Sequence, residues 1–340
     1  MKKRGTVLNK VETTMKMTRK SLRMALASAV LAVSATAVMA EGAKIFVIGG
    51  KADDSFWSIV KRGAEDAGKL AVEQGGSVTW LGPQNYDNLG ADAANLIRNA
   101  ISQGATAIVG PDWVPEAMDE AFRAVVEAGI PLIIYNAGGV AAADRLGAMN
   151  YVGGDDYQSG FAAGEYFGAH GQKKVVCVNT LPGVSNLEAQ CKGLIDGITK
   201  VGGTGEQLPL PSSTFGDATA VSQAVAAFVT QYPDVTGIYT IGNQDAVSAA
   251  AAIAQAGAGD RVKLGGMNMD QTILDNIKSG AQMFAVDQQG YLQGYLAVAM
   301  LNAYVNFGLK VPTREILTGP GIVDAANVDA TMAGVAAGTR

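Results

Sequence analysis

The sequence predicts an α/β protein built from two doubly wound parallel-sheet lobes. Short apolar runs rich in β-forming residues alternate with Ala-rich segments of helical length. Alternation of this kind is typical of a parallel sheet flanked by helices. Because the apolar runs are nearly continuous, helices are expected on both faces of each sheet.

Strands and helices are expected to follow one another along the whole chain. The expected strands are 44–49, 76–81, 106–110, 131–135, 173–178, 236–241, 262–266 and 282–286. The expected helices include 56–73, 89–103, 115–128, 156–169, 186–200, 217–231, 244–256 and 270–279. The two halves of the chain therefore show the same order of elements.

Polar residues recur at corresponding strand ends in the two halves. Asp112 and Asn136 follow strands in the first half, and Asn243 and Asn268 follow strands in the second. Open parallel sheets bind ligands at the carboxyl ends of their strands. Two lobes whose binding edges face each other would form a cleft, and such clefts close by hinge motion.

The first 40 residues are expected to be a cleavable signal peptide. A basic start around Lys16 precedes an apolar core from Met24 to about Val38, and small side chains stand at Val38 and Ala40. A transmembrane anchor needs about 20 apolar residues, whereas this core is shorter and no basic stop follows it. The sequence thus predicts export to the periplasm of a Gram-negative cell.

Charge and composition exclude several classes of function. Residues 1–40 hold eight of the 26 Lys and Arg and one of the 31 Asp and Glu, which leaves 18 against 30 and a net charge of −12. Such a surface repels nucleic acid. The remaining chain of roughly 300 residues is large enough for two cores.

The inventory of reactive side chains predicts no catalytic residue, metal or cofactor. His170 is the only histidine, and it has no credible serine partner. The two cysteines form no Cys-x-x-Cys pair, which argues against zinc or haem. The glycines at 49–50 lack the G-x-G-x-x-G pattern of dinucleotide-binding enzymes. The protein is therefore expected not to be an enzyme.

Cys177 and Cys191 are expected to form a disulfide. The chain is expected to reach an oxidising compartment. Cys177 lies on an expected strand, and Cys191 lies on the helix expected to pack against the same lobe. The alternative is a pair of buried thiols.

Six short motifs follow one another between residues 43 and 323. They are 53–57 with 61–64, 129–136, 153–164, 242–243, 265–268 and 286–291. In their order and spacing the chain resembles the periplasmic sugar-binding proteins of the ribose-binding type. The order of the motifs is specific for this family, although it does not identify the sugar.

The resemblance implies a monomeric periplasmic solute receptor for an ABC importer. The lobes would be 41–153 plus 290–317 and 154–289 plus 318–340, joined by a three-crossing hinge near Gly153, Gln289 and Leu317, with the ligand cleft between them. The expected partners are a sugar or sugar derivative and the transporter permease. The alternative is a sugar sensor that signals to a chemoreceptor or sensor kinase, and the sequence leaves both open.

The resemblance also indicates which side chains contact the ligand. Carboxylates and amides suit the hydroxyls of a polyol, and aromatic rings suit its C–H face. The positions that match the family's pocket are Asp54, Phe56, Trp57, Asp112, Asn136, Glu188, Phe215, Asn243, Asn268, Asp287 and Gln288.

Most of these residues have a structural alternative. Phe56 and Trp57 are equally suited to core packing, and Asp54 to a helix N-cap. Asp112 is also suited to a helix start, Asn243 and Asn268 to strand ends, and Gln288 to a hinge. Glu188 lies one helical turn before Lys192, which is suited to neutralise it.

The departures from the ribose type concern charge. Asn136-Ala137 stands where ribose binders place Asp-Arg, Glu188 where they place a second Arg, and Asn268 where they place Asp. The expected pocket then holds Asp54, Glu188 and Asp287 with no Lys or Arg. Buried negative charge of this kind disfavours acidic or phosphorylated sugars. A neutral sugar, a polyol or an amino sugar is expected.

Overall fold

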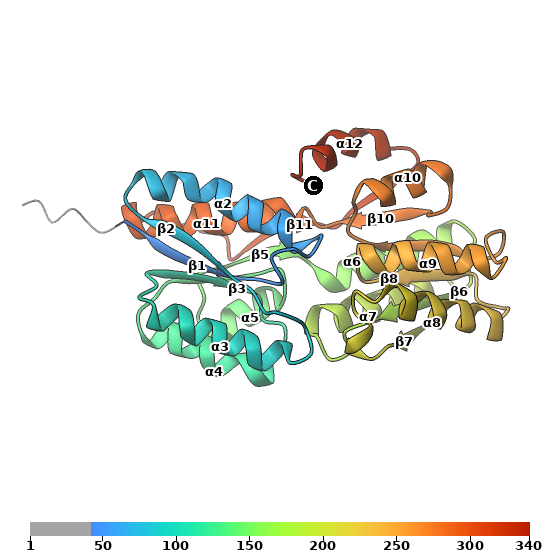
Figure 1. Cartoon of the computed structure of the whole chain (residues 1–340), viewed down its shortest axis with the longest axis horizontal. Helices are drawn as coiled ribbons and strands as arrows, with labels where there is room; N and C mark the ends of the chain where they lie inside the picture. Colours follow the sequence, from blue (N-terminus) through green and yellow to red (C-terminus); the bar gives the residue numbers. More distant parts are fainter. Residues whose placement is uncertain (1–41) are drawn as a thin grey trace, which may run out of the picture. The chain divides into compact units, whose positions relative to one another are not determined.

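The computed structural model describes residues 42–340, so the expected signal peptide lies outside the described residues (Figure 1). The described chain contains two six-stranded sheets of the same plan, in the orders β11-β5-β4-β3-β1-β2 and β12-β10-β9-β8-β6-β7. All neighbouring strands pair in parallel except β10 and β12. The predicted fold class, two doubly wound α/β lobes, is confirmed.

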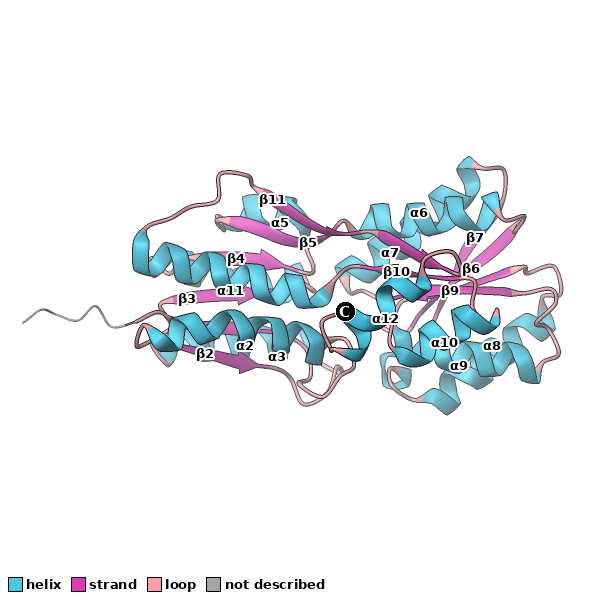
Figure 2. Cartoon of the chain, turned by 90° about the horizontal axis from the view of Figure 1, so that it is seen from above, coloured by secondary structure: helices cyan, strands magenta, loops and turns pink. Residues whose placement is uncertain are grey.

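The first lobe is defined here by the first sheet and its helices. Its strands are β1 (Lys44–Ile48), β2 (Ser77–Leu81), β3 (Ala107–Gly110), β4 (Leu132–Tyr135), β5 (Asn150–Gly154) and β11 (Glu315–Gly319). Its helices are α2 (Trp57–Glu73), α3 (Leu89–Ser102), α4 (Pro115–Glu127), α5 (Gly139–Leu146) and α11 (Gly290–Phe307). Helices α2 and α11 lie side by side on one face of the sheet, and α3 and α4 lie on the other (Figures 1 and 2).

The second lobe repeats this arrangement. Its strands are β6 (Lys174–Asn179), β7 (Thr204–Pro209), β8 (Gly237–Thr240), β9 (Lys263–Met267), β10 (Phe284–Asp287) and β12 (Gly321–Asp324). Its helices are α6 (Asp156–Ala169), α7 (Ser185–Lys200), the 3-10 turn η1 (Ser212–Thr214), α8 (Ala218–Gln231), α9 (Asn243–Gln255), α10 (Gln271–Ser279) and α12 (Val328–Ala336). Three segments connect the lobes, between β5 and α6, between β10 and α11, and between β11 and β12.

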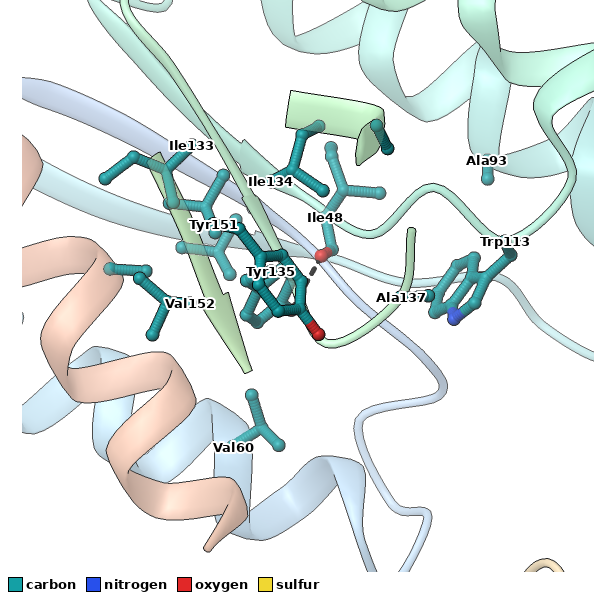
Figure 3. Packing of buried hydrophobic residues seen from close by; sticks show 14 of the residues in the cluster. Ile48, Val60, Ala93, Trp113, Ile133, Ile134, Tyr135, Ala137, Tyr151 and Val152 are labelled. Carbon is teal, nitrogen blue, oxygen red and sulfur yellow. Dashed lines mark hydrogen bonds between the residues drawn. The ribbon is translucent and has the colours of Figure 1, made fainter. Parts of the chain in front are cut away.

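The centre of the first sheet is fully buried, as its continuous apolar runs predict. The side chains of β3 and β4 are all buried, so both faces are covered. Tyr135, at the end of β4, has no exposed surface and donates a hydrogen bond of 2.7 Å to the carbonyl oxygen of Ile48 (Figure 3). This bond satisfies the buried phenol and fixes the end of β4 beside the end of β1.

Glycines allow α6 and α7 to pack with their backbones almost in contact. A Cβ atom on Gly160 would lie 1.9 Å from the carbonyl oxygen of Gln190, and one on Gly193 would lie 2.1 Å from that of Tyr157. No other residue fits at these distances. The close crossing fixes the position of the first turns of α7.

Among residues 42–340, no helix combines the length and the apolar character that a membrane span requires.

Candidate ligand-binding site

A cavity lies between the carboxyl ends of the strands of the two lobes. Its volume is about 90 Å³, on a scale on which one water molecule needs roughly 10–15 Å³. It is therefore sized for a small ligand. The first lobe lines it with Asp54, Ser55, Phe56, Trp57, Tyr86, Leu89, Trp113 and Asn136. The second lobe contributes Leu181, Val184, Asn186, Leu187, Gln190, Phe215, Gly216, Ile241, Gly242, Asn243, Gln244, Asp245 and Asn268, and Gln288 comes from a connecting segment.

Trp57 both lines the cavity and packs in the core of the first lobe. Only 8% of its surface is exposed. Its ring lies 5.4 Å from that of Trp113 and 6.1 Å from that of Tyr135, both edge to face. Phe56 packs on it at 5.2 Å. Trp57 therefore both lines the pocket and packs in the core, so each of its two interpretations is partly correct.

Asp54 lies in the turn that leads into helix α2, three residues before its first residue, and also lines the cavity. Its Oδ1 accepts hydrogen bonds from the backbone N–H groups of Phe56 at 2.9 Å and Trp57 at 3.1 Å, which is the capping arrangement. Its Oδ2 accepts a long hydrogen bond of 3.5 Å from the Tyr86 hydroxyl. Burial is the main cause that raises the pKa of Asp54, although these hydrogen bonds lower it.

Three amide side chains join the two lobes at the base of the cavity. Gln288 donates to Asn268 Oδ1 at 2.8 Å and accepts from Asn136 Nδ2 at 3.3 Å. Asn136 and Asn268 follow β4 and β9, and both have left-handed backbones, with φ of 61° and 63°. Asparagine tolerates this conformation better than most residues. The repeat-related strand ends therefore converge on Gln288.

Two contacts close the cavity from opposite lobes. Ser55 Oγ donates to Asn243 Oδ1 at 2.9 Å, and the Asn243 amide donates to Asp270 Oδ2 at 3.1 Å. The rings of Tyr86 and Phe215 meet edge to face with 4.9 Å between their centroids. The two lobes therefore contact each other directly around the cavity.

Three of the expected pocket residues do not line the cavity. Asp112 has no exposed surface and forms an ion pair with Arg145. Its carbonyl oxygen accepts a hydrogen bond of 2.9 Å from Ser185 Oγ of the second lobe. Asp112 therefore supports a contact between the lobes and does not line the cavity.

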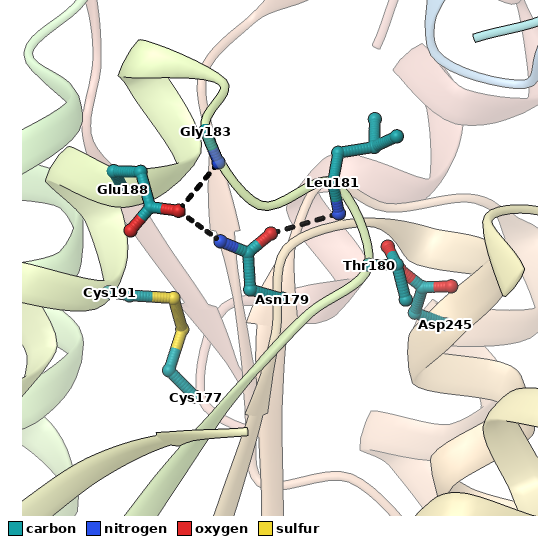
Figure 4. Close-up of a disulfide and its surroundings, with 8 residues drawn as sticks. All are labelled: Cys177, Asn179, Thr180, Leu181, Gly183, Glu188, Cys191 and Asp245. Carbon is teal, nitrogen blue, oxygen red and sulfur yellow. Dashed lines mark hydrogen bonds between the residues drawn. A yellow bond between two sulfur atoms is a disulfide. The ribbon is translucent and has the colours of Figure 1, made fainter. Parts of the chain in front are cut away.

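Glu188 is the second of these residues. Its Oε1 accepts hydrogen bonds from Asn179 Nδ2 at 3.1 Å and from the Gly183 N–H at 2.8 Å (Figure 4). The expected neutralisation by Lys192 is wrong, because Lys192 pairs with Asp196 one turn further along α7. Glu188 holds the loop before α7 in place.

Asp287 is the third expected pocket residue that does not line the cavity. Its Oδ2 accepts a hydrogen bond of 2.6 Å from Arg340 Nε, and its Oδ1 accepts one of 2.8 Å from the Gln289 N–H. The expectation that no cation compensates this carboxylate is wrong. Arg340 is 53 residues away in sequence, and no local pattern indicates the contact.

Asp245, Asn186 and Gln190 line the cavity but were not expected from the sequence. Asp245 is 2% exposed and accepts a hydrogen bond of 2.8 Å from Thr180 Oγ1. Burial raises its pKa to about 6, with a smaller contribution from Asp54. Its position two residues after Asn243, in the first turn of α9, is the available sequence signal.

Asn186 and Gln190 lie one turn apart on α7 and share its cavity-facing side. Gln190 donates to Asp156 Oδ1 at 3.0 Å. The Oδ1 of Asn186 and the Oε1 of Gln190 are buried and accept no hydrogen bond. Buried polar atoms are normally paired, so these two oxygens mark a place where a ligand can donate.

The predicted disulfide joins Cys177 of β6 to Cys191 of α7, with 5.5 Å between their Cα atoms (Figure 4). Both residues are fully buried. The disulfide ties α7 to the sheet one residue beyond Gln190. It therefore helps to position the cavity-facing side of this helix.

The part of the chain that the structure describes brings together no group of three His, Cys, Asp or Glu side chains able to hold a metal ion.

Residues 45–310 match the family of the periplasmic binding protein domain, and the chain belongs to this family. The expected kinship with periplasmic sugar-binding proteins of ABC transporters is confirmed. One curated relative is the xylose/arabinose-binding protein XylF of Sulfolobus acidocaldarius, 26% identical over 73% of this chain. The matched region spans 63% of the length of that relative.

Solved structures of similar proteins share the fold. A carbohydrate transporter from Acidothermus cellulolyticus 11B in complex with myo-inositol is 28% identical, with a TM-score of 0.79 over 88% of this chain and 100% of that one. A solute-binding protein from Burkholderia graminis C4D1M in complex with D-arabinose is 22% identical, with a TM-score of 0.73 over 85% and 97%.

Proposed function

We propose that this protein captures a monosaccharide, a polyol or an amino derivative of one in the cavity between its lobes and delivers it to an ABC importer. One observation carries the proposal. The cavity combines aromatic faces, most of them from the first lobe, with amides mainly from the second lobe and one carboxylate from each. This pairing suits a small ring with an apolar C–H face and a hydroxylated edge.

The charge of the cavity narrows the class of solute. Within residues 42–340, no Lys, Arg or His lines the cavity, whereas Asp54 and Asp245 do. A phosphate or carboxylate on the ligand would face these carboxylates without a cation to offset the repulsion. The myo-inositol and D-arabinose bound by the two similar structures are neutral, which supports the same class.

Capture is proposed to proceed by closure of the lobes about their three connecting segments. The Ser55–Asn243 hydrogen bond and the Tyr86–Phe215 contact form only when the lobes meet. A ligand that bridges Asp54 and Asn243 would stabilise the closed arrangement. We place this activity in the periplasm, after removal of the signal peptide expected at residues 1–40.

Sensing is a second candidate function. The XylFII-LytSN complex contains a chain of the same fold, with a TM-score of 0.72 at 19% identity. Uptake of the labelled solute by cells that lack this protein separates the two functions. Loss of uptake supports delivery, and retained uptake with a lost transcriptional response supports sensing.

A thermal-shift screen of the purified protein tests the proposed class of solute. The panel contains myo-inositol, pentoses, hexoses, hexosamines and sugar phosphates. A ligand at a thousand times its Kd should stabilise the protein by about 4 kcal/mol. A shift with an uncharged or amino member and none with the sugar phosphates is expected. A panel in which only the phosphates shift the protein, or in which none does, contradicts the proposal.

A further inference from the structure

Within residues 42–340, the cavity is lined by two carboxylates from opposite lobes and by no Lys, Arg or His. Asp54 faces it from the start of α2, and Asp245 faces it from the first turn of α9. The only hydrogen-bond donor to the side chain of Asp245 in the described structure is Thr180 Oγ1. Like charges that approach in a space with little water repel each other strongly.

Among the described residues, nearby charged groups offset this charge only in part. Lys51 is the cation next to Asp54 and lowers the pKa of that carboxyl, but it lies 3.7 Å from Asp53 and lines the adjoining outer groove, not the cavity. On α10, next to α9, Asp270 adds a further negative charge near Asn243. The remaining candidate cations of this region, Arg145 and Arg340, pair with Asp112 and Asp287 outside the cavity.

The adjacent wall, on α7, adds two acceptor oxygens that have no hydrogen-bond partner. Asn186 Oδ1 and Gln190 Oε1 are buried and unpartnered, and Gln190 is only 1% exposed. Its amide N–H₂ is directed to Asp156, which fixes the oxygen as the free atom. Two carboxylates and two amide oxygens from three elements therefore favour a ligand rich in donors.

We propose that the solute carries one ammonium group, which lies between Asp54 and Asp245, so that the protein prefers an amino sugar or an aminocyclitol to its neutral parent. The inference rests on the proposed function, because it assigns the ligand of the same cavity. An ammonium supplies three donors and one positive charge. Its bonds to carboxylates are stronger than those of a hydroxyl at the same place.

The preference depends on pH in a defined direction. Burial raises the pKa of Asp245 to about 6 and also raises that of Asp54. An ammonium requires ionised carboxylates, so its affinity should increase as the pH rises from about 5 to about 7. A neutral parent favours a protonated carboxyl in the closed cavity, so its affinity should fall over the same range.

Calorimetric titration with matched pairs tests the inference. The pairs are D-glucosamine with D-glucose, D-galactosamine with D-galactose, and an amino-deoxy-inositol with myo-inositol. In the pair that binds, the amine should bind about tenfold more tightly or better near pH 7, and the ratio should shrink near pH 5. A parent that binds as tightly as its amine overturns this inference and leaves the proposed function standing. Absence of binding by every member overturns this inference, and the wider solute panel, which includes pentoses, then decides the proposed function.

Substitution of the carboxylates assigns the effect to the cavity. Asp245→Asn keeps an oxygen for Thr180 and removes the charge, and Asp54→Asn likewise keeps the cap of α2. Either variant should reduce the affinity ratio of amine to parent about tenfold. Asp275→Asn, at an exposed position of α10 outside the cavity, makes the same change in net charge and should leave the ratio unchanged. Thermal melting shows whether each cavity variant is folded. If both folded variants keep the affinity ratio of amine to parent, the assignment is overturned.

Discussion

The two lobes share one strand order but contribute different chemistry to the cavity. The first lobe presents most of the aromatic faces, chiefly Phe56, Trp57 and Trp113, whereas the second presents most of the polar groups, such as Asn243 and Asp245. The shared plan places both sets at the carboxyl ends of parallel strands. The residues just after the strands then decide what each wall contacts.

The two walls also differ in how they are held. Trp57 is part of the first lobe's hydrophobic core, so this wall cannot change without loss of core packing. The polar wall lies on the first turns of α7 and α9, and α7 is fixed by its glycine crossing and by the disulfide. Substitutions in the first wall are therefore expected to change protein stability and ligand binding together. In the second wall, a substitution is expected to change one of these without the other.

The largest effect is expected from Trp57→Ala. Removal of a buried aromatic side chain costs about 3–5 kcal/mol in the free energy of unfolding, and loss of the cavity's aromatic face should weaken ligand binding as well. Chemical denaturation measures the stability change. Trp57→Phe, which keeps an aromatic ring, is the matched control and should cost less. A loss below about 1 kcal/mol in Trp57→Ala would return this residue to a purely ligand-facing role.

The next effect concerns the disulfide. Cys177 and Cys191 are 14 residues apart, and closure of a loop of about 15 residues contributes roughly 3 kcal/mol. The double substitution Cys177→Ala and Cys191→Ala should lower the free energy of unfolding by about that amount. Ligand affinity should also fall, because the disulfide ties α7 to its sheet. Equal stability of the double variant and the parent protein would refute this contribution.

A smaller effect, confined to binding, is expected from Asn243→Ala. The change removes the hydrogen bonds of Asn243 with Ser55 and Asp270 and an amide that faces the ligand. Affinity should fall about tenfold, since a hydrogen bond contributes roughly 0.5–1.5 kcal/mol. Asn276→Ala, on α10 outside the cavity, should leave affinity unchanged. Equal titration curves for both variants would remove Asn243 from the binding surface.

Phe56→Leu should give the smallest effect. The substitution keeps an apolar side chain and loses the aromatic face, so affinity should fall about threefold to tenfold. The cost in stability should stay below about 1.5 kcal/mol. Comparison of its titration with that of Trp57→Ala separates ring contact from core packing. An unchanged affinity would show that the ligand does not lie against Phe56.

The sequence predicts the buried part of the fold better than its edges. The eight apolar runs are strands, whereas the edge strands β7, β11 and β12 were not expected. Among the described residues, the one buried strand that was not expected is β5, where Asn150, Gly153 and Gly154 interrupt the apolar pattern. Strand β7, for example, has the sequence TGEQLP and no buried side chain. An edge strand that faces water does not need an apolar run, so it leaves no such pattern.

Local sequence patterns likewise predict only part of the candidate site. Asn136 and Asn268 could be expected because both follow strands at repeat-related positions. The cavity-facing side of α7 could not, since Glu188 lies between Asn186 and Gln190 and local sequence does not show which of them faces the other lobe. The ion pair of Asp287 with Arg340 depends on a long-range contact, which local patterns do not encode.

The proposal that a small solute binds in the cavity between the lobes is best tested by a crystal structure with the tightest ligand from the solute panel. We expect the ligand to lie within the cavity between the lobes, with its C–H face against Phe56 or Trp113. Its polar groups should lie within hydrogen-bonding distance of Asn243 and Gln190. A ligand bound in the outer groove or elsewhere on the protein, with the cavity filled only by water, would contradict it.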